Sequence, residues 1–189
     1  MEYAGLLKQR RTVRLFRQEA VADETLAALV DAARVASCAS NKQRLRYIVV
    51  RTPEVVLEVL KHTRWAGLVQ PRRTPQPGVT SPAAFIVITT TESELSELLC
   101  ADAGAAVQSM EFAACDAGLG CCWLGAIDRN AIETLLGCGK IVYLVAVGYP
   151  AETPRSVDVA VDDSVAYYID ENDTLTVPKI RLEDVMKWR

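Results

Sequence analysis

Three arginines and a threonine lie within five residues near the N-terminus, at Arg10, Arg11, Thr12 and Arg14. Guanidinium groups donate paired hydrogen bonds to phosphate oxygens, and a fixed cation also stabilises a developing anion. This arginine run (residues 10–14) therefore suits an anionic ligand such as a phosphate. The alternative is an ordinary solvated basic surface, which is the commoner explanation for an isolated cluster of charged side chains.

A second basic pair, Lys179 and Arg181, lies near the other end of the chain. Residues two apart in an extended segment project from the same face, and Pro178 favours extension just before them. The pair could complete an anion site with the arginine run. It could equally form a polar strand edge that discourages aggregation, and the long separation in sequence leaves both interpretations open.

Two further segments carry small residues that let a ligand approach the backbone. Residues 37–43 read SCASNKQ and offer backbone amides together with two side-chain amides. Residues 120–125 read GCCWLG, and the amides near Leu124 and Gly125 could face a flat heteroaromatic ring. The structural alternatives are a helix-terminating loop for the first segment and a plain core strand for the second.

Several common chemistries lack their residues. Gly118 and Gly120 follow an expected helix rather than a strand, and position 123 is Trp, so the dinucleotide fingerprint fails. The single histidine, His62, has no neighbouring nucleophile or metal ligand in sequence. Adjacent Cys121 and Cys122 would point to opposite faces of a strand, so we expect packing rather than a metal site. The six cysteines are expected to be reduced and mostly buried.

Length and composition limit the remaining classes. A chain of 189 residues that is 50% hydrophobic suits one domain over 1–189. The net charge of −3, with both signs interspersed, gives no basic field for a nucleic acid. No apolar run is long enough to span a membrane, and residues 1–14 lack the apolar core of a signal peptide. We therefore expect a cytoplasmic protein with neither a nucleic-acid nor a membrane partner.

The elements that must position these residues alternate between helices and strands. Helical spacing begins at Asp23, an expected N-cap, and ends near Ala36. Residues 71–82 are expected to form a loop. Three further helices are expected: one that begins at Thr52-Pro53, one over 102–117 with Gly118 as its C-cap, and one from Asp128 to Gly137. Strands are expected over 47–50, 83–90, 121–124, 141–147 and 175–181, the last as an edge or exchanged strand. This alternation indicates an α+β fold.

Taken together, the motifs resemble those of the FMN-dependent nitroreductase family. Residues 10–16 read RRTVRLF, against R-R-S-x-R-x-F in the family. Residues 36–45 keep Asn41 and Gln43 of A-P-S-x-x-N-x-Q-P-W but not its prolines or tryptophan. Four later motifs of the family also find matches: D-A-G-A-A-x-Q at 102–108, G-L-G-x-x-W-L-G at 118–125, the strand end G-Y-P at 148–150, and the terminal K-x-R at 179–181. The order is that of the family, and the match is weakest between about 62 and 81.

The resemblance implies a nitroreductase-like fold, with a central mixed or antiparallel sheet flanked by helices, in an intertwined homodimer whose FMN sites lie between two chains. It assigns the FMN phosphate and ribityl chain to Arg10, Arg11, Thr12, Lys179 and Arg181, and the pyrimidine edge to Arg14. It places Trp123, Leu124 and Gly125 against the ring, with the Gly125 amide toward N5, and takes Cys38, Ala39 and Asn41 from the partner subunit.

The activity implied by the resemblance is electron transfer from NAD(P)H to a nitroaromatic, a quinone or a similar small-molecule acceptor, by a ping-pong hydride mechanism that needs no protein nucleophile. The alternative is an FMN-binding carrier or sensor of the same fold, and reductive dehalogenation or flavin destruction also stays open. The sequence leaves undecided the physiological acceptor and the choice between NADH and NADPH. Within the segment 62–81, Trp65 and residues 72–75 could gate the site, and Trp65 could instead only fill the core.

Overall fold

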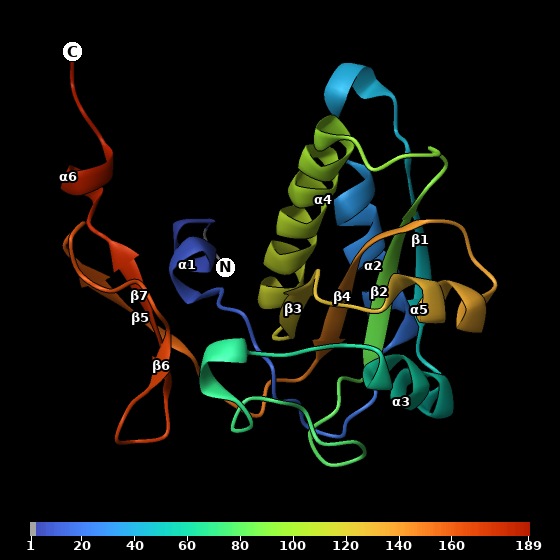
Figure 1. Cartoon of the computed structure of the whole chain (residues 1–189), viewed down its shortest axis with the longest axis horizontal. Coiled ribbons are helices and arrows are strands. Elements are labelled where there is room, and N and C mark those ends of the chain that lie inside the picture. The colour runs from blue at the N-terminus through green and yellow to red at the C-terminus, as the bar shows by residue number, and fades with distance from the viewer. Residues whose placement is uncertain (1–2) are drawn as a thin grey trace.

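A four-stranded antiparallel sheet forms the centre of the computed structural model, which describes residues 3–189 (Figure 1). Its strands are β1 (Leu45–Val50), β2 (Ala84–Thr90), β3 (Gly120–Leu124) and β4 (Ile141–Gly148), in the order β1-β2-β4-β3. All seven residues of β2 are buried. A continuous apolar strand such as AFIVITT is stable only where both of its faces are covered.

Helices cover both faces of this sheet, and alternate residues of β2 show which helix lies on which side. Ile86 and Ile88 pack against α2 (Asp23–Arg34) and α4 (Glu97–Asp116). Phe85 and Val87 point the other way, toward α3 (Pro53–Lys61) and α5 (Arg129–Leu136). The two hydrophobic clusters follow from the period-2 alternation of a strand.

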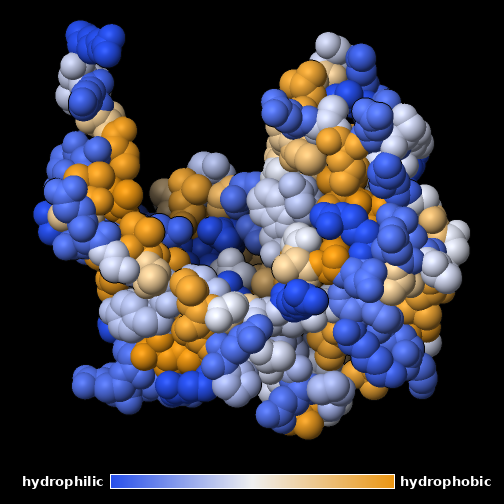
Figure 2. Space-filling model, viewed as in Figure 1, coloured by the Kyte–Doolittle hydropathy of each residue, from blue (hydrophilic) through white to orange (hydrophobic). Residues whose placement is uncertain are grey.

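The last residues form a separate layer, which we call the C-terminal arm (residues 155–189). It contains β5 (Arg155–Val159), β6 (Tyr168–Ile169) and β7 (Leu175–Ile180), in the order β5-β7-β6, followed by the short helix α6 (Leu182–Val185). Figures 1 and 2 show the arm standing away from the main body, with α1 (Tyr3–Gln9) behind the hollow between them. Short 3-10 turns, η1 (Ala39–Asn41) and η2 (Gly67–Val69), interrupt the connections.

The structure confirms the α+β class and the predicted strands and helices, with shifted ends. The prediction of an edge strand at 175–181 was wrong, because β7 is the middle strand of its sheet and pairs with β5 on one side and β6 on the other. The helix predicted from Asp102 begins at Glu97, because the Ser96 hydroxyl caps it by accepting a hydrogen bond from the Leu99 amide at 3.2 Å. Asp23 is the first residue of α2 rather than its cap, a position that Ala22 holds without a side-chain bond. The elements α1, β5, β6 and α6 were not predicted. Within residues 3–189, no helix is long and apolar enough to cross a bilayer.

Candidate functional site

The arginine run lies along the exposed edge of β3. The Val13 amide donates to the Cys121 carbonyl at 2.9 Å, and Thr12 forms a parallel bridge with Cys121. Gly120 permits this approach, because a Cβ at that position would lie 2.6 Å from the Cβ of Val13. Farther along, Phe16 is fully buried and pairs with Pro150 after β4. The backbone that carries the arginines is therefore fixed at both ends.

Arg10 and Arg11 differ in their partners. The Arg10 guanidinium donates to Glu111 on α4 at 3.1 Å, and this carboxylate is 5% exposed. Burial raises the pKa of Glu111, and the Arg10 charge opposes that shift. Arg11 donates to the Arg10 carbonyl at 2.6 Å and to the Ser156 hydroxyl of β5. Partial burial and, after it, the neighbouring Arg10 lower the pKa of Arg11, so a further anion between these two cations would be stabilised.

Arg14 lies between the body and the arm. Its guanidinium carbon is 5.3 Å from the ring centroid of Tyr167, a cation–π contact with the arm. Its backbone amide donates to the Glu152 carboxylate at 2.6 Å, and the Leu15 amide donates to the same oxygen at 3.1 Å. The position of Arg14 thus depends on a buried carboxylate that the sequence analysis did not single out.

A cavity of about 200 Å³ opens beside the arginine run and β3. Its lining includes Arg10, Arg11, Glu111 and Cys121. Burial raises the pKa of the Cys121 thiol well above its ordinary range and that of Cys122 to about 12, so both thiols stay protonated and pack in the core. All six cysteines are free, but only these two are buried, so the prediction of mostly buried thiols was wrong. No group of three or more His, Cys, Asp or Glu side chains among the described residues could hold a metal ion.

An exposed tryptophan lies near the end of β3. The Trp123 side chain is 40% exposed and stands edge-on to the Tyr143 ring, with 5.0 Å between centroids. The same Tyr143 ring would lie 3.6 Å from a Cβ at Gly125. Leu124 is buried in the cluster on the α3 side, so its side chain points away from the face that carries the Trp123 ring. These three residues lie together, as their adjacency requires.

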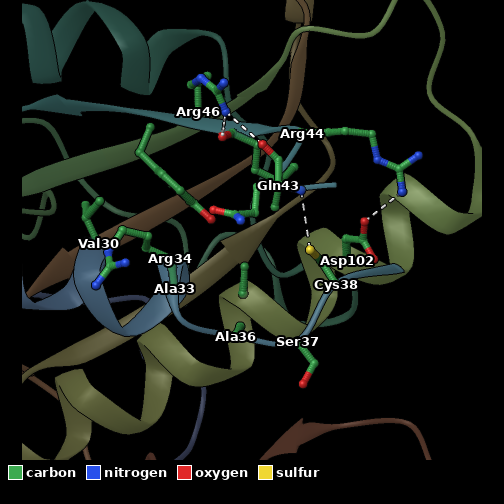
Figure 3. Close-up of a pocket in the computed structure, with 13 residues that line it drawn as sticks. Val30, Ala33, Arg34, Ala36, Ser37, Cys38, Gln43, Arg44, Arg46 and Asp102 are labelled. Carbon is green, nitrogen blue, oxygen red and sulfur yellow. Dashed lines mark hydrogen bonds and ion pairs between the residues drawn. The ribbon is translucent and has the colours of Figure 1, made fainter. Parts of the chain in front are cut away.

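Residues 37–43 form a loop around the buried carboxylate of Asp102 on α4 (Figure 3). The Ala39 amide donates to one carboxylate oxygen and the Arg44 guanidinium to the other, both at 2.8 Å. The Cys38 sulfur accepts from the Gln43 amide at 3.4 Å, and the Gln43 side chain donates to Asn41 at 3.2 Å. The loop lines a cavity of about 430 Å³ with α2 and β1.

Within one chain, this loop and the arginine run lie toward opposite ends of α4 (Figure 1). Asp102 holds the loop and Glu111 holds Arg10. The two carboxylates are nine positions apart in sequence, about 14 Å along a helix axis at 1.5 Å per residue. A single chain therefore does not bring Cys38, Ala39 and Asn41 to the arginine run.

Lys179 and Arg181 lie in the arm, with exposed side chains. Neither side chain forms a hydrogen bond or ion pair with another residue of 3–189. Lys179 is in β7, but Arg181 lies one residue beyond it, at the start of α6, and its amide donates to the Val159 carbonyl at 3.0 Å. The argument from strand alternation therefore holds for Lys179 only.

Sequence reasoning missed the acidic partners of the site: Glu111, Glu152 and, as a loop anchor, Asp102. For Asp102 and Glu111, a usable signal was a carboxylate within the otherwise apolar helix α4, because such a charge requires a partner. Trp65 is 3% exposed and packs in the α3 cluster, in agreement with the alternative that it fills the core.

Comparisons with known proteins agree with this architecture. The model of the Nitroreductase family matches residues 7–149. A protein of Archaeoglobus fulgidus, named as a candidate NADH dehydrogenase/NAD(P)H nitroreductase, is 26% identical over 162 residues, 80% of this chain and 87% of its own. The structure of a candidate nitroreductase from Desulfovibrio desulfuricans, in complex with FMN, has a TM-score of 0.67 and 28% identity over 85% of this chain and 93% of that one.

A nitroreductase family protein from Streptococcus pneumoniae TIGR4 has a TM-score of 0.70 at 17% identity and covers 100% of both chains, so the shared fold includes the arm. The family match spans the arginine run, the loop at 37–43, α4 and all four strands of the main sheet. On this evidence, the chain belongs to the nitroreductase family.

Proposed function

We propose that the chain binds FMN as a single domain and works as an NAD(P)H-dependent oxidoreductase that reduces a nitroaromatic, a quinone or a similar acceptor. The observation that carries the proposal is the arginine run held against β3, beside the exposed Trp123. The family match supports it, as do the FMN complex of the Desulfovibrio relative and the nitroreductase names of distant relatives.

The donor set suits the FMN phosphate. Arg10 and Arg11 place two guanidinium groups side by side, and only Arg10 has a carboxylate partner within hydrogen-bonding distance. A phosphate dianion would offset the remaining positive charge, and the Thr12 hydroxyl would add a donor. The Arg11 contact to Ser156 shows that the arm reaches this place, so Lys179 and Arg181 are proposed to complete the phosphate site from β7 and its end.

The isoalloxazine ring is proposed to lie against Trp123, Leu124 and Gly125, with Arg14 at its pyrimidine edge. Bound FMN would supply reversible two-electron hydride chemistry. The contribution of Arg14 is a fixed positive charge that stabilises negative charge developing nearby. Trp123 and Tyr143 supply an apolar wall that keeps water away from that edge.

A homodimer is part of the proposal. The arm carries several large exposed hydrophobic side chains, which include Leu182, Val185 and Trp188, the last 89% exposed. Leu98 is exposed on α4 as well. Apolar side chains gathered on a projecting segment are typical of an interface (Figure 2). A second copy that covers them would also bring its Cys38, Ala39 and Asn41 to the site, which a single chain does not do.

The visible absorption spectrum of the purified protein tests the proposal first. FMN released at one per chain, from a particle that elutes as a dimer, would support the site. Oxidation of NADH or NADPH in the presence of a nitroarene or a quinone would then support the activity. A protein that binds FMN but does not turn over would favour a carrier or sensor, and a colourless protein that rejects added FMN would refute the proposal.

A further inference from the structure

A buried ion pair joins three segments that are far apart in sequence. Arg73, from the loop between η2 and β2, lies 2.8 Å from Glu152, which follows β4, and the side chains are 5% and 6% exposed. The two atoms are close without the alignment of a hydrogen bond, so the attraction is mainly one of charge. The predicted gating role of residues 72–75 does not fit Arg73, because a buried, paired guanidinium cannot reach a substrate.

Each member of the pair holds a different part of the proposed FMN site. The second oxygen of Glu152 accepts the backbone amides of Arg14 and Leu15, which fixes the strand that carries the Arg14 guanidinium. The Arg73 guanidinium donates to the carbonyl of Asp173, in the turn between β6 and β7. Asp173 has a φ of 58°, a left-handed conformation that a bound carbonyl helps to hold.

The turn at Asp173 leads directly into β7, the strand that ends beside Lys179 and Arg181. The contact of Arg14 with Tyr167 reaches the same arm just before β6. The buried Arg73 guanidinium therefore links Arg14, proposed for the edge of the FMN ring, to β7, which leads to the residues proposed for the FMN phosphate.

We propose that Arg73 and Glu152 are positioning residues that couple the backbone at Arg14 to the C-terminal arm. The coupling is a property of the protein alone, and its effect on FMN rests on the function proposed above. Neither residue touches the cofactor in this scheme. The pair helps to fix the distance between two sets of proposed FMN ligands that lie in different layers of the fold.

The chain offers a matched control in the adjacent Arg72. Its guanidinium also contacts Asp173, through the side-chain carboxylate, but the two side chains are 54% and 65% exposed. An exposed pair of this kind contributes little, because water and salt screen it. Arg72→Met therefore removes a neighbouring arginine and a contact to the same turn while it leaves the buried pair in place.

The test begins with amide hydrogen exchange on the full-length protein without FMN. Arg73→Met is expected to reduce protection at residues 168–176 and at the amides of residues 14 and 15, and Arg72→Met is not. After FMN is added, its dissociation constant should rise about tenfold in Arg73→Met, equivalent to about 1.4 kcal/mol. The midpoint potential of bound FMN should also shift, because the charge of Arg14 moves relative to the ring.

A second variant separates positioning from stability. Arg73→Met alone leaves the Glu152 charge buried and unpaired, which can unfold the protein. Arg73→Met combined with Glu152→Gln removes that charge and keeps an amide oxygen for the two backbone amides. The double variant should recover most of the thermal stability and the protection at residues 14 and 15, while the arm stays unprotected and FMN binding stays weak.

The outcomes distinguish the two proposals. If both variants keep arm protection and FMN affinity within about twofold of the parent, or if Arg72→Met has the same effect as Arg73→Met, the coupling is refuted. If the parent protein binds no FMN while Arg73→Met still loosens the arm, the coupling stands and the proposed function fails.

Discussion

Gly120→Ala tests whether the close approach of the arginine run to β3 is essential. The added Cβ would lie 2.6, 2.7 and 2.9 Å from Cβ, Cγ2 and Cγ1 of Val13. Carbon atoms prefer separations of about 3.5–4.0 Å, so the two backbones must move apart by roughly 1 Å. Rotation of the Val13 side chain cannot relieve the contact, because Cβ is fixed by the backbone.

The cost has two parts. Overpacking of a filled site costs about 1–3 kcal/mol. The hydrogen bond from the Val13 amide to Cys121, now 2.9 Å, would lengthen and lose about 0.5–1.5 kcal/mol. The total of about 1.5–4.5 kcal/mol corresponds to a fall in Tm of roughly 3–18 °C for a chain of this size. Because Arg14 follows Val13 directly, FMN affinity should fall as well.

Thermal unfolding followed by circular dichroism, with and without FMN, measures both effects. Gly67→Ala is the control: no atom lies within 4 Å of its added Cβ, and we expect a change within about 0.5 kcal/mol. Val13→Ala should not rescue Gly120→Ala, since the closest contact is to the Cβ that alanine keeps. A Gly120→Ala protein with the parent Tm would refute the argument that this glycine sets the spacing.

Three further changes test other parts of the site. Arg14→Ala should weaken FMN binding and lower the midpoint potential of bound FMN, by about 30 mV for each tenfold loss in the preference of the protein for reduced over oxidised FMN. Redox titration measures this potential, and an unchanged value would contradict the placement of Arg14 at the ring edge. Asp102→Ala leaves Arg44 buried without its partner and frees the Ala39 amide, so the free energy of unfolding in urea should fall by up to about 3–5 kcal/mol. A fall below about 1 kcal/mol would mean that water replaces the carboxylate. Burial raises the pKa of Glu111 in the folded state, so between the unfolded and folded pKa values the folded protein binds more protons than the unfolded chain. Its stability therefore falls as the pH rises through that interval. Glu111→Gln should reduce this dependence of Tm on pH, measured by thermal unfolding from about pH 4 upward.

Local patterns determined most of the fold. The apolar run at 83–90 predicted a strand covered on both faces, and β2 is such a strand. Asp128 and Gly137 predicted the two ends of α5, where they form the N-cap and a left-handed C-cap. These features depend on neighbours within a few residues, so the order of the amino acids is enough to reveal them. The weak turn signals of the arm gave no such pattern, and β5 and β6 were missed.

Candidate site residues could also be named from the sequence, because each cluster is contiguous and follows the family order, and their roles stay a prediction. What the sequence could not determine is which groups donate hydrogen bonds to the buried carboxylates. The Arg10 guanidinium donates to Glu111 across 101 residues, the Ala39 amide donates to Asp102 across 63, and the Arg14 amide donates to Glu152 across 138. Such pairs have no periodicity, because their spacing depends on the whole path of the chain. The tertiary structure alone therefore decided that the arginine run rests on buried carboxylates, that Arg73 is buried beside Glu152, and that the loop at 37–43 lies far along α4 from the arginines of its own chain.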